Sequence, residues 1–289
     1  MNIELPIENA LDRFVPSFDT VVHWFNTPKE EARLFFLELV KDNNQLTDKE
    51  KIALIYNSRK AIREFGNCKS IYENAINIFR NNNQNITCEE IDGNTIDVDW
   101  LELFFDKAKL VNNKDLQIIW SNILANKMEK PDSINPSLIH TLSIISTEQA
   151  NFFCNISRFC FEERKSDIVH PLIFIKTNKK AYENSGITDQ KLRELHRLGL
   201  IEYNPEKEFV FENKKTIVKG NFQIDIYGDE NDRNIIKAGN VFFTQDGLDL
   251  YSIVGSDVKK YRNDILDFTV ERLIHRKCKV YINGKAIIF

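Results

Sequence analysis

The stretch TDQKLRELHRLGLIEYNPEKEFVFE, residues 188–212, carries the clearest structural signal in the chain. Thr188 is suited to cap a helix whose leucines recur at helical spacing, and Gly199 is suited to end that helix in the left-handed conformation. A short strand follows, and turn residues at 204–207 lead the chain back into a second strand over 208–212. The stretch therefore predicts a helix followed directly by a β-hairpin.

A helix followed by a β-hairpin is the order of elements in winged helix-turn-helix domains, where the hairpin is the wing. If this unit bound DNA, its helix would enter the major groove and basic residues near the wing would contact phosphate. The basic residues in these places are Lys191, Arg193 and Arg197 on the helix and Lys207, Lys214 and Lys215 on and after the hairpin. Glutamates are interspersed among them and would repel phosphate, which favours a packing or protein-docking module over one that reads DNA.

The remainder of the second half mixes strand and helix patterns. β-Branched or alternating runs predict further strands at 168–175, 222–227 and 241–243. Thr244 opens a short helix after the last of these, and a longer helix is predicted at 257–276. The dipeptide Asn283-Gly284 is a strong hairpin signal and is expected to join two strands at the end of the sequence.

The first part of the chain has the periodicity of helices. One helix is predicted at 30–41, a second begins at Thr47 with Glu50 completing a capping box, and a third lies at about 69–80. The asparagine-rich tract at 81–85 then interrupts the helical pattern.

Apolar residues are patterned most strongly in the middle of the chain. Asp97 or Asp99 is suited to cap a helix, and a second helix after Asn113 has apolar residues at 116, 119, 120, 123 and 124. Ser146, with Gln149 three positions later, opens another helix. Short, closely connected helices of this kind are expected to pack antiparallel.

These patterns predict a fold of the α+β class, mainly α. The predicted regions are a helical N-terminal region at 1–92, a compact helical domain at 93–165, and an α+β, winged-helix-like C-terminal domain at 166–289.

A family resemblance rests on five short motifs. The segments DWLELFFD at 99–106 and LQIIWSNILAN at 116–126, followed by Pro136, Leu142 and Ile145-Ser146, resemble a bacterial family of unassigned activity. Its consensus is DWxxxFF, then QxxWxxxLA, then a Pro/Ser-led leucine helix. That family is similar to the abortive-infection alpha (Abi-alpha) proteins. Its C-terminal motifs LxxLGLI and LTxxGxxL correspond here to LHRLGLI at 195–201 and, with phenylalanine in first place, FTQDGLDL at 243–250. The resemblance implies a bacterial context with anti-phage or stress biology, and it brings no catalytic residues.

Gln117 and Trp120 are the two residues of this middle segment that match the family pattern most closely. One interpretation places them on a face that binds a partner. The other makes Trp120 a core residue of an amphipathic helix and Gln117 a polar neighbour that holds a turn or loop, since a large aromatic side chain on an apolar stripe usually buries area. The family generally has an acidic residue after the Leu-Ala pair, whereas this chain has Asn126-Lys127.

Composition and motifs argue against most kinds of active site. Net charge is −4 with acidic and basic residues well mixed, unlike a protein that coats nucleic acid. The five cysteines contain no CxxC pair, the histidines are scattered, and neither a P-loop nor a GxGxxG motif is present. Glu212-Asn213-Lys214 has the ExK spacing of restriction-like nucleases, but the required aspartate on a preceding strand is missing. We therefore predict no catalytic, cofactor-binding or metal-binding residues.

The resulting hypothesis is a non-enzymatic interaction or regulatory protein of an anti-phage system that binds a protein partner or itself. The alternatives are a DNA-binding regulator that uses residues 188–215 and a nuclease or other effector with an unrecognised site. The N-terminus lacks the pattern of a signal peptide, and no apolar run reaches the length of about 18 residues that a membrane span requires. We expect a cytoplasmic protein without a membrane partner.

Overall fold

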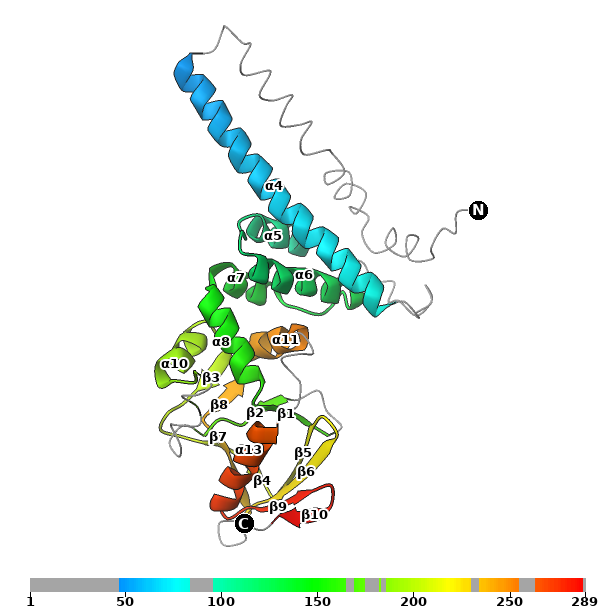
Figure 1. Ribbon diagram of the computed structural model, residues 1–289, viewed down its shortest axis with the longest axis vertical. Coiled ribbons are helices and arrows are strands. Elements are labelled where there is room, and N and C mark those ends of the chain that lie inside the picture. Colours follow the sequence, from blue (N-terminus) through cyan, green and yellow to red (C-terminus); the bar gives the residue numbers. More distant parts are fainter. Residues whose placement is uncertain are drawn as a thin grey trace, which may run out of the picture. The chain divides into compact units, whose positions relative to one another are not determined.

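A computed structural model describes residues 47–83, 96–164, 169–174, 182, 186–229, 234–254 and 263–287 (Figure 1). The chain folds into two compact units, Met1–Ser143 and Ile144–Phe289. Helices prevail overall and the sheets lie in the second unit, which confirms the predicted α+β, mainly α class. The helix predicted at 30–41 lies outside the described residues, and the division into three regions stays a prediction.

Helix α4, Asp48–Asn82, runs without a break through the two helices predicted from Thr47 and at 69–80. The predicted capping box is present, because the Glu50 carboxylate accepts a hydrogen bond from the Thr47 backbone N–H at 2.8 Å. The prediction of a break was wrong: Gly66 costs about 1 kcal/mol relative to alanine, which is too little to stop a helix that tertiary packing supports. The helix ends in the asparagine tract, as predicted.

Three further helices complete the described part of the first unit: α5, Val98–Ala108; α6, Lys114–Glu129; and α7, Pro136–Ile144. Asp97 caps α5 and Asn113 caps α6, each by accepting backbone N–H hydrogen bonds. The second half of α4 packs mainly against α6. Trp100 stacks on Phe104 at 5.2 Å between ring centroids, and Phe104 contacts Trp120 at 5.1 Å. The family-like tryptophans thus form the aromatic core of this unit.

The second unit begins with α8, Thr147–Ser157, whose capping box from Ser146 and Gln149 is present as predicted. The short strands β1, Cys160–Glu163, and β2, Val169–Pro171, follow and pair antiparallel. Helix α10, Asp189–Arg197, is capped by Thr188.

A long, interrupted β-ribbon follows α10. Its outgoing arm consists of β3, Ile201–Tyr203; β4, Phe209–Glu212; and β5, Lys214–Lys219. Its return arm consists of β6, Phe222–Tyr227; β7, Ile235–Gly239; and β8, Val241–Phe243. The pairs are β5 with β6, β4 with β7, and β3 with β8, all antiparallel. The tip of the ribbon lies at Gly220 and Asn221, and its base returns the chain next to α10.

The hairpin predicted between the strand after Gly199 and residues 208–212 is therefore wrong, because β3 and β4 belong to the same arm. The predicted turn at 204–207 does form, since Asn204 Oδ1 accepts the N–H of Glu206 at 2.9 Å and of Lys207 at 3.0 Å. It bulges out instead of reversing the chain. Opposite the bulge, Asn240 accepts the Asn204 N–H at 3.1 Å and donates from Nδ2 to the Asn204 carbonyl at 3.0 Å.

The described residues include a six-stranded sheet in the order β10-β9-β6-β5-β1-β2. Its last two strands are β9, Lys279–Ile282, and β10, Lys285–Ile287, joined at Asn283 and Gly284 as predicted, both with positive φ. Helix α13, Asn263–His275, packs on the sheet. The core between them contains Ile217, Ile224, Ile226 and Val280 from the sheet and Leu266, Val270 and Leu273 from the helix.

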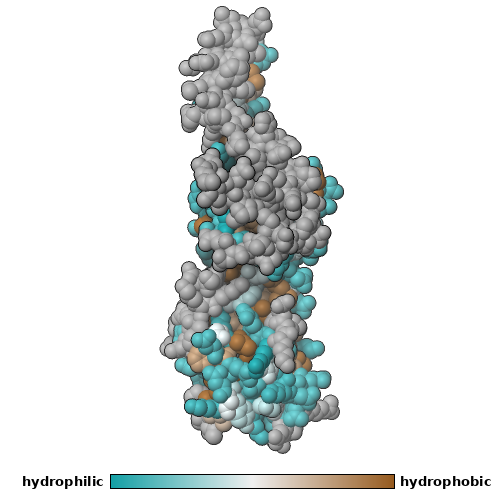
Figure 2. All heavy atoms as spheres, turned by 90° about the vertical axis from the view of Figure 1, so that its right-hand side faces the viewer, coloured by the Kyte–Doolittle hydropathy of each residue, from teal (hydrophilic) through white to brown (hydrophobic). Residues whose placement is uncertain are grey.

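On the face drawn in Figure 2, the described residues are mostly hydrophilic and the hydrophobic ones form small patches. Within the described ranges, no helix combines the length and the apolar character needed to cross a bilayer.

Candidate functional site

The base of the ribbon is held by hydrogen bonds and close backbone packing against the start of helix α11, Gln245–Ile253. Gly199 takes the left-handed conformation predicted for it, with φ of 74°. The Thr244 N–H donates to the Leu200 carbonyl at 3.3 Å, and the Thr244 hydroxyl donates to the Gly199 carbonyl at 2.5 Å. A Cβ atom on Gly247 would lie 1.9 Å from the Leu200 carbonyl oxygen, so only glycine fits there. The motifs at 195–201 and 243–250 thus contact each other directly, and we call this contact of Thr244 and Gly247 with Gly199 and Leu200 the α10–α11 joint.

Two basic residues of α10, Lys191 and Arg193, have carboxylate partners within the same unit. Lys191 Nζ lies 3.2 Å from Glu148 Oε1, and Arg193 Nε donates to Asp189 Oδ2 at 2.8 Å. Phosphate would have to compete with these partners at both positions.

The two lysines of β5 are paired as well. Lys214 Nζ lies 3.3 Å from Asp225 Oδ1 and 4.9 Å from the centre of the Tyr227 ring. Lys215 Nζ lies 2.7 Å from Glu163 Oε2, and this hydrogen bond is the main cause of a lowered pKa at Glu163. Exposed Arg197 and Lys207 form no ion pair with another residue that the structure describes. The six predicted DNA contacts therefore do not form one open cationic surface.

The structure also shows where the residues of the ExK pattern, Glu212 and Lys214, lie. Lys214 contacts Asp225 on the paired strand β6, whereas Glu212 is exposed on β4. Asp225 in addition accepts hydrogen bonds from Thr216 and Gln223. In the part of the chain that the structure describes, no three His, Cys, Asp or Glu side chains are grouped so as to hold a metal ion.

Gln117 and Trp120 lie in the interior of the first unit, with 1% and 0% of their surface exposed. Gln117 Nε2 donates to the Val111 carbonyl at 2.7 Å and to Asn67 Oδ1 at 3.1 Å. Its Oε1 atom accepts from Ser70 at 3.2 Å. This network joins α4 to α6, so the interpretation of these two residues as a partner-binding face is not supported. Sequence reasoning missed Asn67, because nothing near it in the chain marks it as a partner of Gln117.

A buried histidine lies behind the ribbon. His170 on β2 is 3% exposed, and its ring contacts Phe211 and Phe242 with centroid distances of 4.6 and 5.5 Å. Its Nε2 atom is 3.5 Å from Glu163 Oε2. Burial lowers the pKa of His170 and the charge of Lys215 lowers it further, while Glu163 acts in the opposite direction. The net effect favours the neutral form of the ring over the protonated form.

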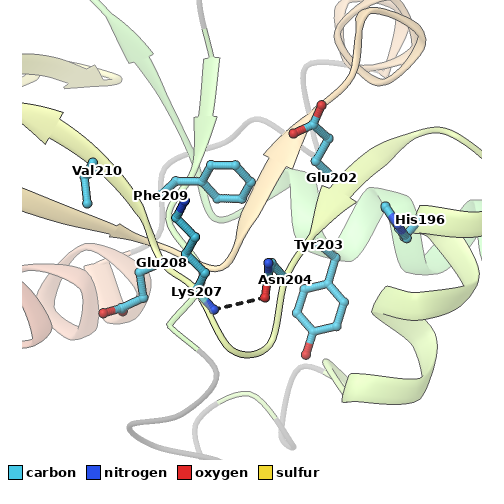
Figure 3. Close-up of a pocket in the computed structure, with 8 residues that line it drawn as sticks. All are labelled: His196, Glu202, Tyr203, Asn204, Lys207, Glu208, Phe209 and Val210. Carbon is cyan, nitrogen blue, oxygen red and sulfur yellow. Dashed lines mark hydrogen bonds between the residues drawn. The ribbon is translucent and has the colours of Figure 1, made fainter.

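A pocket of about 680 Å³ opens at the bulge of the ribbon (Figure 3). Its lining comes from the end of α10, from β3, from the bulge and from the start of β4: His196, Glu202, Tyr203, Asn204, Lys207, Glu208, Phe209 and Val210. Phe209 packs on Phe242 with ring centroids 4.2 Å apart, whereas Val210 is 52% exposed. The pocket thus combines apolar side chains with a rim of acidic and basic residues, Glu202, Glu208 and Lys207.

The orientation of His196 gives the pocket a polar contact. Its Nδ1 atom lies 2.9 Å from the Ile201 carbonyl oxygen, and since a carbonyl only accepts, Nδ1 is the donor. In the neutral ring Nε2 then keeps its lone pair and is an acceptor. Of the other rim residues, the Glu208 carboxylate accepts a hydrogen bond from Arg276, which directly follows α13. Sequence reasoning missed this pocket, because it depends on the pairing of the ribbon arms.

These features define a mainly helical α+β protein in which a capped helix leads into a long, bulged β-ribbon. The family model described as "Protein of unknown function (DUF2806)" matches residues 57–265. The match spans most of the chain, from within α4 to within α13, and the chain belongs to this family. Comparisons with curated proteins and with solved structures gave no match.

Proposed function

We propose that this chain is a non-enzymatic interaction or regulatory protein that binds a protein partner at the surface around the α10–ribbon pocket. The observation that carries the proposal is the pocket lining, in which Tyr203, Phe209 and half-exposed Val210 lie inside a rim of mixed charge. Apolar contact area surrounded by polar residues is typical of protein interfaces. Phosphate would instead meet Glu202 and Glu208.

The biological setting belongs to the same proposal. The motifs at 99–106 and 116–126 resemble a family similar to the Abi-alpha proteins, which supports a bacterial, anti-phage role. In such a role the helical unit would act as a scaffold, since its family-like residues are buried. We further propose a cytoplasmic location.

The test uses the tagged full-length chain expressed in its native host, with gentle cross-linking, purification and a mass measurement by light scattering. We expect a species heavier than a single chain, with a second polypeptide or a second copy in fixed proportion. A lone monomer, with and without phage challenge, would overturn the proposal.

A DNA-binding regulator is the second candidate, and one observation favours it. Helix α10, the paired strands β3 and β8, and α11 follow one another in the order of a winged helix, with most of the ribbon inserted in the wing. Exposed Arg197 and Lys207 would then contact phosphate. This candidate predicts duplex binding that weakens with salt and in the double variant Arg197→Ala and Lys207→Ala. Absence of binding at low salt would remove it.

A further inference from the structure

The outer edge of the ribbon next to the pocket is a strand edge. Antiparallel strands direct the N–H and C=O of alternate residues to the paired strand and those of the residues between them to the other side. On β3, the hydrogen bonds from Thr244 N to Leu200 O and from Asn204 N to Asn240 O turn the backbone groups of 200 and 204 toward the return arm. The backbone groups of Ile201 and Tyr203 therefore face outward.

The pocket lies on this outward edge. His196 reaches the Ile201 carbonyl, which faces away from β8, and the same histidine lines the pocket. On β4, hydrogen bonds of Asn213 with Asn234 and Gly228 set the corresponding pattern and turn the backbone of Val210 outward. Neither β3 nor β4 pairs on this side with another strand among the described residues. Strand edge and apolar pocket therefore occur together.

We propose that this edge accepts an extended peptide segment of a partner protein, which adds a strand to the ribbon and places one apolar side chain in the pocket. The inference rests on the proposed function and specifies the chemistry of the partner. In strand addition, main-chain hydrogen bonds supply affinity and a pocket beside the edge supplies specificity. Here Tyr203 and Val210 supply outward backbone groups, and Phe209 supplies apolar contact.

Two further features specify the peptide. With Nδ1 donating to the Ile201 carbonyl, His196 Nε2 is the ring atom that accepts a hydrogen bond from the bound segment. Glu202 and Lys207 on the rim are oppositely charged and exposed, which disfavours a ligand of high net charge of either sign. The predicted segment is therefore of low net charge and contains a single large aliphatic or aromatic anchor.

The probe is a phage-displayed library of random dodecapeptides, selected on the full-length chain. We expect enriched peptides to share one large apolar residue among β-forming neighbours. Val210→Asp should lower the affinity of the chain for synthetic copies of the enriched peptides at least tenfold. The matched control is Ile118→Asp, which introduces the same charge at a helical residue that is 54% exposed, close to the 52% of Val210, and it should leave the affinity unchanged. Because both residues are exposed, neither variant should unfold the chain.

N-Methylation of the winning peptides, one amide at a time, tests the strand geometry. Strand addition predicts that affinity is lost at every second position, because only alternate amides face the ribbon. Failure to enrich any peptide, equal binding to both variants, or an effect of N-methylation without this alternation would overturn the proposal. If the partner complex in the native host persists in Val210→Asp, the peptide site fails while the interaction role stands. A lone wild-type monomer there would instead remove the interaction role.

Discussion

Replacement of Gly247 by alanine gives a sharp test of the joint between the ribbon and α11. Gly247 lies in the first turn of the helix, and helix propensity alone favours alanine over glycine by about 1 kcal/mol. The structure predicts instead that alanine at this position lowers the stability of the protein. The added methyl group would meet the Leu200 carbonyl oxygen at 1.9 Å and the carbonyl carbon at 3.0 Å, and both atoms belong to the backbone.

The size of the effect follows from these opposing contributions. Overpacking of a well-packed site usually costs about 1–3 kcal/mol, and a clash with backbone belongs at or above the upper end of that range. After the gain in helix propensity is subtracted, we expect Gly247→Ala to lower the free energy of unfolding by about 2 kcal/mol. The Leu200 backbone must move, which lengthens its hydrogen bond from Thr244 and loosens the pairing of β3 with β8.

Urea denaturation followed by circular dichroism measures the change, and hydrogen exchange with mass spectrometry locates it at β3, β8 and α11. Trp100 and Trp120 are buried in the first unit, so their fluorescence monitors that unit separately. Gln245→Ala, an exposed change in the same helix, is the control and should alter stability by less than about 0.5 kcal/mol. A Gly247→Ala protein as stable as the wild type would refute the reasoning.

Three further changes have defined outcomes. Gln117→Leu should destabilise the helical unit by about 2–3 kcal/mol, because acceptors are left buried without their donor, and an unchanged midpoint by tryptophan fluorescence would contradict this. The lowered pKa of His170 means that the unfolded state binds its proton first, so stability should fall as pH drops below about 6.5, and His170→Gln should reduce this dependence in urea titrations. Asn240→Ala should release the bulge at 204–208, seen as faster exchange there and a loss of about 1–3 kcal/mol; unchanged exchange would argue against the anchoring role.

Helix starts could be predicted from the sequence because capping is a local interaction. A side-chain oxygen bonds a backbone N–H two or three residues away, so the residues needed stand together in the chain. The structure has such caps at Thr47, Asp97, Asn113, Ser146, Thr188 and Thr244. Gly199 and the Asn283-Gly284 turn were predictable for the same reason, since both depend on backbone preferences of the residue itself.

Strand partners could not be predicted in this way. The alternation of β3 fits any antiparallel neighbour, and the turn at 204–207 made the nearest strand appear to be its partner. The actual partner, β8, is selected by the joint of Thr244 and Gly247 with the end of α10, which is a tertiary contact. The candidate site was missed for the same reason, and the carboxylate partners of Lys191 and Lys215 also come from distant parts of the chain.

The register of the ribbon has a consequence for the order in which this protein folds. Paired residues are separated by three positions at the tip, between Lys219 and Phe222, and by 42 at the base, between Ile201 and Phe243. Closing the base first would require a long loop to be ordered at once, whereas growth from the tip adds each pair at little entropic cost. We therefore expect the tip to form early and the α10–α11 joint late. Slow formation of the tip would then delay completion of the surface that α10 and the bulge present, although that surface lies at the other end of the ribbon.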